Sequence, residues 1–173
     1  MNKLFLITGP AGVGKSTISK MIAENLEKSV LIEGDDIYHL VVGGYVSPWK
    51  EGNHLKLFWE NCIDIIKNSI NAGYDVVFNY ILKKNQVEEL KNHFLNCEIK
   101  FICLIVNEET IIKRDKLRPA DCQMGERCLI LLRDALNAGF DKNNILDTSD
   151  LTEQETYKAV SYTHLTLPTI RLV

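Results

Sequence analysis

The segment that most constrains this chain is GPAGVGKS, from Gly9 to Ser16, which directly follows a short apolar run, Lys3–Thr8. It matches the pattern G-x-x-x-x-G-K-[ST], typical of a loop that binds phosphate groups, at every fixed position. Glycines let the backbone bend so that several N–H groups point into one concavity. The helix predicted from Lys15 adds the positive end of its dipole. The sequence therefore predicts a bound nucleoside triphosphate.

Each residue type in this loop has a chemical reason. Lys15 supplies a mobile charge for the β- and γ-phosphates, and Ser16 places its hydroxyl on Mg²⁺. Thr17 adds a contact to the α-phosphate. The alternative, a glycine-rich turn without a ligand, is disfavoured because the loop joins a strand to an amphipathic helix. We expect ATP contacts from Gly9, Ala11, Gly12, Val13, Gly14, Lys15, Ser16 and Thr17.

Apolar runs and helical periods alternate along the chain. The apolar runs predict strands at Lys3–Thr8, Val30–Glu33, Asp75–Asn79, Ile99–Val106 and Asn144–Asp147. The helical periods predict helices at Lys15–Lys28, Asn53–Ala72, Asn85–Leu95, 107–118, Met124–Ala138 and from Leu151 onward, the last capped by Thr148–Asp150. This alternation predicts an α/β fold with helices on both faces of a parallel sheet.

Length, charge and the lengths of the apolar stretches disfavour several classes of function. A length of 173 residues fits one domain. A net charge of -3 without a basic run disfavours general nucleic-acid binding. No apolar stretch approaches the roughly 18–20 residues that span a bilayer. We therefore expect a cytoplasmic monomer or weak dimer that binds neither nucleic acid nor membrane, with reduced structural cysteines.

The C-terminal residues differ from the rest. Residues 161–173, SYTHLTLPTIRLV, contain no acidic residue and interrupt the last predicted helix. We expect a domain over residues 1–160 and a tail over 161–173 that is foreign to it, such as translated vector sequence. The alternative is a real edge strand, which the β-rich composition of the tail favours.

The motifs that are absent and those that are present indicate which class of nucleotide-binding protein this is. The chain lacks the N/T-K-x-D motif of a GTPase, and it is short for a large motor or AAA-type ATPase. Four segments, GPAGVGKST, IEGDDIYH, KRDKLR and ILDTS, make it resemble the small P-loop kinases. This group includes gluconate kinase, shikimate kinase and chloramphenicol phosphotransferase, and the chain looks most like uncharacterised bacterial gluconate-kinase-like proteins. The resemblance implies a P-loop NTPase fold, a three-layer αβα sandwich with strand order 2-3-1-4-5 and a short helical lid.

The acceptor side is expected after the second strand, at Glu33–Asp36. Asp35 matches the aspartate of the family's G-D pair, which can take the proton of the acceptor hydroxyl or orient it. The alternative is that Asp35 or Asp36 caps a helix. We expect acceptor contacts from Asp35, Asp36, His39, Tyr45, Trp49 and Asn79. For Trp49 the alternative is a cover packed on the core.

Two further positions depend on the resemblance. Asn79 ends the third strand, where a Walker-B-like aspartate often holds a water on Mg²⁺. Because an amide stands there, either Asp35 holds this water as a metal ligand, or Asn79 contacts the acceptor. Thr148 and Ser149 stand at the turn that passes the adenine in the family, and plain capping is the alternative.

Three arginines form the expected lid. Arg114 and Arg118 lie four residues apart on one helical face, and Arg127 follows near the next helix start. Convergent guanidiniums suit the charge that develops on a transferring phosphoryl group. The alternative is surface salt bridging with Asp115 and Glu126. We expect Arg114 and Arg118 to be catalytic and Arg127 to bind nucleotide.

Together these residues predict an ATP- and Mg²⁺-dependent kinase for a hydroxyl of a small metabolite or antibiotic. Lys15, Asp35, Arg114 and Arg118 would be its catalytic residues. One alternative is a nucleoside or nucleotide kinase, with the acceptor stacked on Trp49 or Tyr45, although residues 33–60 contain no arginine. Another is a non-catalytic ATP-binding module.

Overall fold

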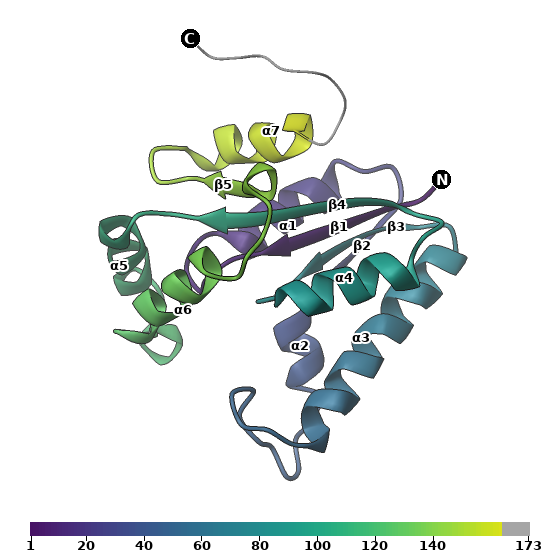
Figure 1. Cartoon of the computed structure of the whole chain (residues 1–173), viewed down its shortest axis with the longest axis horizontal. Helices are drawn as coiled ribbons and strands as arrows, with labels where there is room; N and C mark the ends of the chain where they lie inside the picture. Colours follow the sequence, from purple (N-terminus) through teal and green to yellow (C-terminus); the bar gives the residue numbers. More distant parts are fainter. Residues whose placement is uncertain (164–173) are drawn as a thin grey trace.

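The computed structural model describes residues 1–163, and its centre is a five-stranded sheet (Figure 1). The strands are β1 (Lys3–Thr8), β2 (Ser29–Glu33), β3 (Asp75–Asn79), β4 (Glu98–Ile105) and β5 (Ile145–Asp147). All neighbouring pairs are parallel, in the order β2-β3-β1-β4-β5. The predicted strand order is confirmed. It places the carboxyl end of β1, where the phosphate loop begins, in the middle of one sheet edge.

Most of the helices lie where the periodicity predicts them, with shifted ends; the exception is the short helix after β2, which the periodicity does not predict. They are α1 (Lys15–Glu24), α2 (Gly34–Tyr38), α3 (Asn53–Asn71), α4 (Lys84–His93), α5 (Glu108–Lys116), α6 (Arg127–Leu136) and α7 (Glu153–Thr163). Short 3₁₀ turns occupy Ala120–Cys122 and Lys142–Asn144. Within residues 1–163, none of the helices has the length and apolar character needed to cross a membrane.

Two apolar clusters hold the layers together, one on each face of the sheet. Alternate residues of β1 point to opposite faces, so Leu4 packs on one side and Phe5 on the other. The first cluster contains buried residues of α3 and α4, and the second contains those of α1, α5, α6 and α7. Ile66 of α3 has no exposed surface, so Ile66→Ala would cost about 2–5 kcal/mol. The predicted three-layer arrangement is confirmed.

Two helix starts differ from the sequence prediction. The last helix is capped by Thr152 rather than by Thr148–Asp150: the Thr152 hydroxyl accepts from the Glu155 N–H at 3.2 Å, and the Glu155 carboxylate accepts from the Thr152 N–H at 2.9 Å. Helix α6 begins at Arg127, not Met124, because the N–H groups just before it bind a carboxylate instead of a helical turn.

Helix α7 continues to Thr163, three residues past the predicted boundary at 160. The remainder of the predicted tail, 164–173, lies outside the described residues, and so does the alternative edge strand.

Candidate functional site

The phosphate loop joins β1 to α1, and close packing shapes it. A Cβ on Gly9 would lie 2.2 Å from the Leu104 carbonyl oxygen of β4, and Gly9 has φ 140°. Gly14, which directly precedes α1, has φ 104°. Both positions therefore require glycine. These two glycines, which are fixed positions of the motif, allow the backbone to bend as the sequence predicts.

Lys15 begins α1, and its ammonium donates to the Pro10 carbonyl at 3.0 Å. Burial lowers the pKa of Lys15 to about 8, although Asp35 and Glu33 nearby oppose this shift. Arg118 is close enough to lower that pKa further. The loop thus holds a desolvated cation, which a phosphate would stabilise.

Ser16 lies in a polar cluster formed by the ends of two adjacent strands. Its hydroxyl donates to the Glu33 carboxylate at 3.1 Å and accepts from the Asn79 amide at 3.1 Å. The buried Asn79 amide also donates to Glu33, which lies opposite it in the β2–β3 register. Desolvation raises the pKa of Glu33, and the neighbouring Asp36 and Asp35 charges add to this, while the Ser16 hydrogen bond opposes it.

The oxygen atoms of this cluster suit Mg²⁺. Mg²⁺ prefers oxygen ligands and usually binds through one or two protein groups together with phosphates and waters. Within residues 1–163, no three His, Cys, Asp or Glu side chains form a cage that could hold a metal. A Mg²⁺ beside Ser16 would therefore need nucleotide phosphates, and Glu33 is placed to hold its waters.

Asp35 and Asp36 lie in the first turn of α2 and are exposed. No side-chain hydrogen bond caps this helix, so the capping alternative for these two residues is wrong. A Cβ on Gly34 would lie 2.6 Å from the Tyr80 ring, so this glycine lets the strand end pack directly on Tyr80. Burial raises the pKa of Tyr80, and the Asp35 charge adds to this effect. The Asp35 charge therefore acts both on Lys15 of the phosphate loop and on Tyr80.

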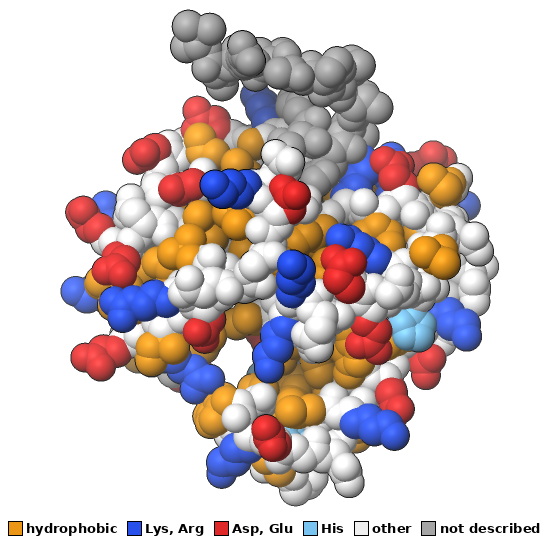
Figure 2. Space-filling view, in the orientation of Figure 1, with side chains coloured by type: hydrophobic (Ala, Val, Ile, Leu, Met, Phe, Trp, Pro, Cys, Tyr) orange, Lys and Arg blue, Asp and Glu red, His pale blue; other side chains and the backbone are white. Residues whose placement is uncertain are grey.

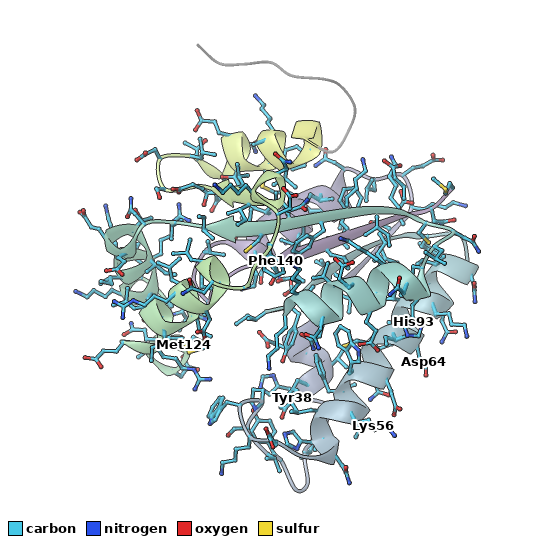
Figure 3. The ribbon with its side chains drawn as sticks, in the orientation of Figure 1. Tyr38, Lys56, Asp64, His93, Met124 and Phe140 are labelled. Atoms are coloured by element: carbon cyan, nitrogen blue, oxygen red, sulfur yellow. The ribbon has the colours of Figure 1, made fainter. Side chains whose placement is uncertain are left out.

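The acceptor loop, residues 39–52, follows α2 and is rich in aromatic contacts. His39 stacks on Tyr45 with ring centroids 5.9 Å apart, and Tyr45 packs edge-on against Tyr38 at 5.8 Å. The Tyr38 hydroxyl, which belongs to the side chain labelled in Figure 3, donates to the Val46 carbonyl. Trp49 is 62% exposed, so the alternative that it packs on the core as a cover is wrong.

The lid, residues 117–126, connects α5 to α6. It is anchored by Asp115, which the sequence analysis considered only as a surface salt-bridge partner. Asp115 is buried, and its carboxylate accepts from the N–H groups of Met124 and Gly125 at 3.0 and 2.9 Å. Desolvation works to raise the pKa of Asp115, but these backbone bonds and Arg118 outweigh it and hold that pKa below its usual range. Figure 3 labels Met124 on the lid side of the molecule.

The three predicted arginines have different settings. Arg114 donates to the Val13 carbonyl at 2.9 Å and to the Thr148 carbonyl at 3.2 Å, so it ties the phosphate loop to the turn after β5. Arg118 pairs with Asp115 at 3.4 Å, as the salt-bridge alternative expects, and also influences Lys15. The Arg127 guanidinium lies 4.0 Å from the centroid of the Trp49 ring.

Thr148 and Ser149 join the end of β5 to the start of α5. The buried Thr148 donates through its N–H and its hydroxyl to the Ile105 carbonyl. The Ser149 hydroxyl accepts from the Asn107 N–H at 2.7 Å and donates to Asp147. These bonds fix the turn, and a role beside the adenine stays a prediction.

Sequence reasoning missed Glu33, Asp115 and Tyr80 as site residues. Glu33 could have been found, because adjacent parallel strands bring the last residue of β2 opposite Asn79. Asp115 carries no such signal, since its partners are backbone groups about ten positions later in the chain. Direct contact of Asp35 with Mg²⁺, and contact of Asn79 with an acceptor, stay predictions.

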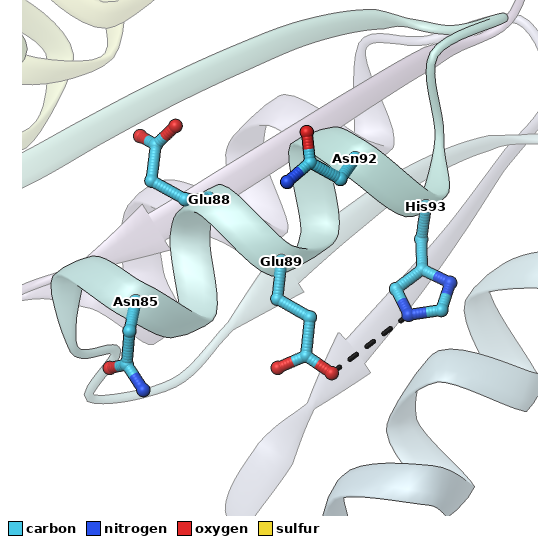
Figure 4. A pocket seen from close by; sticks show the side chains of 5 residues that line it. All are labelled: Asn85, Glu88, Glu89, Asn92 and His93. Carbon is cyan, nitrogen blue, oxygen red and sulfur yellow. Dashed lines mark ion pairs between the residues drawn. The ribbon is translucent and has the colours of Figure 1, made fainter.

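A second hollow lies on the outer face of α4, away from these residues (Figure 4). Its polar side chains include His93 and Glu89, which lie 3.8 Å apart. Within the described residues, no hydrogen bond or ion pair joins this face to the phosphate loop. None of the site residues predicted from the sequence lines this hollow.

Comparison with known proteins agrees with this geometry. A family model described as an AAA domain matches residues 6–128, from β1 through the lid to the start of α6. The chain belongs to this AAA domain family. No curated protein matches the chain.

Three solved structures match nearly all of the chain. A sugar kinase from Janibacter sp. HTCC2649 has a TM-score of 0.69 at 16% identity, covering 94% of both chains. The tunicamycin resistance protein of Deinococcus radiodurans has a TM-score of 0.66 at 18% identity, covering 98% of this chain and 100% of its own. A gluconokinase from Sinorhizobium meliloti 1021 has a TM-score of 0.60 at 18% identity, covering 94% and 93%. The chain thus has the fold of the small P-loop kinases, as its motifs predict.

Proposed function

We propose that this protein transfers the γ-phosphoryl group of Mg-ATP to a hydroxyl group of a small metabolite or antibiotic. One observation carries the proposal: the phosphate loop and the carboxylates at the end of β2 meet at one point. Ser16 is bonded to Glu33, and Lys15 is influenced by the charges of both Glu33 and Asp35. A nucleotide-binding group and a group that can activate a hydroxyl therefore share one site.

Asp35 is the residue best placed to act on the acceptor. It is exposed, borders the aromatic side chain of Tyr80, and is free of helix capping. As a carboxylate it can accept the proton of the attacking hydroxyl or fix its orientation. Glu33 lies deeper, against Ser16, and would orient the waters of a bound Mg²⁺. The metal, when bound, neutralises charge on the transferring phosphates.

Arg118 supplies the remaining charge. Its charge acts on Lys15 from the lid. Its ion pair with Asp115 holds the guanidinium in place. A guanidinium there can stabilise the charge on the equatorial oxygens of the transferring phosphoryl group. Arg114 uses its donors on two backbone carbonyls, so its part is to position the phosphate loop.

The test is a panel of hydroxylated metabolites and antibiotics, scored for release of ADP from Mg-ATP. At least one compound should accelerate ADP release, and Asp35→Asn should lower that rate about 100-fold or more. The matched control is Asp64→Asn, which removes a carboxylate from the exposed surface of α3 (Figure 3). If ATP binds but no acceptor in the panel accelerates its consumption, the chain is a non-catalytic nucleotide-binding module.

A further inference from the structure

One contact joins the two sides of the acceptor site. The Arg127 guanidinium at the start of α6 lies over the ring of Trp49 in the acceptor loop, 4.0 Å from its centroid. Figure 2 shows the surface hollowed between the lid and the acceptor loop. Within residues 1–163, no hydrogen bond or ion pair joins α6 to the acceptor loop. This stacked pair therefore bridges the hollow by itself.

Neither partner is held there by other side chains. Trp49 is 62% exposed, so core packing does not fix its ring. In the part of the chain that the structure describes, the Arg127 guanidinium makes no hydrogen bond or ion pair. A guanidinium has five N–H donors and binds phosphate oxygens in a planar fork. Arg127 thus retains the donors that a phosphate would use.

The start of α6 is also held near the phosphate loop through Asp115. A Cβ on Gly12 would lie 4.0 Å from the backbone nitrogen of Asp115. The Asp115 carboxylate in turn holds the Gly125 N–H at 2.9 Å, two residues before Arg127. The Asp115 hydrogen bond therefore holds the segment that leads into Arg127 near the phosphate loop.

We propose that Trp49 and Arg127 form a latch across the acceptor site, and that the γ-phosphate of a bound nucleotide draws Arg127 away from Trp49. The inference rests on the proposed function, because it requires a triphosphate in the loop. A charge-assisted bidentate contact to phosphate is stronger than an exposed cation–π contact, so the phosphate wins the competition. A diphosphate lacks the competing group and leaves the latch closed. The acceptor site then opens after the triphosphate binds.

The first test is the affinity of Trp49→Ala for nucleotides, measured by calorimetry with Mg²⁺ and a non-hydrolysable ATP analogue. Without a latch to open, this variant should bind the analogue about two- to five-fold more tightly than the unaltered protein. Its affinity for ADP should not change. A merely structural role for Trp49 would weaken binding of both nucleotides. Unchanged or weaker binding of the analogue overturns the latch.

The second test follows Trp49 directly. The chain has two tryptophans, so Trp59→Phe leaves Trp49 as the single fluorophore. The ATP analogue should increase quenching of Trp49 by acrylamide, and ADP should not. Adding Arg127→Met should produce the open signal without nucleotide and abolish the response. The matched control is Arg133→Met, which removes an exposed arginine of α6 that pairs with Glu108.

The outcomes separate the latch from the proposed function. A fluorescence response that survives Arg127→Met overturns the latch, and so does the absence of any response while calorimetry shows the analogue bound. If Trp59→Phe fails to fold, the difference between the unaltered protein and Trp49→Phe gives the same signal. Failure of the unaltered protein to bind the analogue at all overturns the proposed function instead.

Discussion

The phosphate loop and the acceptor loop lie at the same edge of the sheet but are held in opposite ways. In the phosphate loop, Ala11 and Val13 are buried, and Arg114 bonds the Val13 carbonyl. In the acceptor loop, Leu40 and Val42 are 68% and 89% exposed. Buried side chains and the Arg114 hydrogen bond fix the first loop, whereas much of the second is exposed and loosely packed. Substitutions should therefore affect nucleotide chemistry strongly at the first and acceptor choice at the second.

The largest effect should come from Lys15→Ala. Removing the buried ammonium leaves the β- and γ-phosphates without their counter-charge, so phosphoryl transfer should fall about 1,000-fold. Stabilisation of the protein by nucleotide should disappear from thermal unfolding curves. Lys20→Ala is the control, because Lys20 is an exposed residue of the same helix that pairs with Glu24. Transfer at the rate of the unaltered protein would show that the loop does not serve phosphoryl transfer.

Arg118→Ala and Arg114→Ala should change different kinetic constants. Arg118→Ala should lower kcat about 100- to 1,000-fold with little change in the KM for ATP, because Arg118 acts on charge that develops during transfer. Arg118→Lys should restore only part of the activity, since a point charge cannot replace a planar fork.

Arg114→Ala should instead raise the KM for ATP, because it releases the Val13 and Thr148 carbonyls from their donor. Steady-state kinetics with an identified acceptor distinguishes the two variants. If both variants lost the same kcat, Arg114 would act at the phosphates, which would contradict its role in joining the phosphate loop to the turn after β5.

Nucleotide affinity should depend on pH through Lys15. The pKa of this buried lysine is lowered to about 8, so its ammonium loses a proton as the pH rises through that value. Bound phosphate favours the charged form, and binding above that pH must therefore take up a proton. Affinity should fall by up to about tenfold per pH unit above pH 8. Calorimetry in two buffers of different ionisation enthalpy measures the uptake, and Lys15→Met should abolish it.

The smallest effect should come from His39→Ala in the acceptor loop. The His39 ring is exposed, stacks on Tyr45, which is itself 45% exposed, and meets Tyr38 only edge-on at 6.3 Å. Its loss should change the free energy of unfolding by less than about 1 kcal/mol. ATP affinity should be unaltered, and the KM for the acceptor should change. A large loss of ATP affinity would contradict the separation of the two loops.

The same contrast explains what the sequence could predict. The strands and the phosphate loop follow from local patterns, because the middle of strand β3, Val76–Phe78, is an apolar run and the loop is a contiguous motif. The polar cluster around Ser16 required the sheet order, since Glu33 and Asn79 are 46 positions apart. The stacking of Arg127 on Trp49 has no sequence signature, because it depends on how the start of α6 and the exposed acceptor loop lie relative to each other.

The hydrogen bonds of Asp115 have a consequence for how this lid could change over evolution. The carboxylate accepts hydrogen bonds from the backbone N–H groups of Met124 and Gly125. These bonds do not depend on which side chain stands at position 124. The residues between, 119–123, are exposed. Apart from Gln123, whose side chain donates to the Lys116 and Arg118 carbonyls, their identities can change while the buried aspartate maintains the path of the chain. Most of the lid sequence can therefore vary without a change in the fold that carries it.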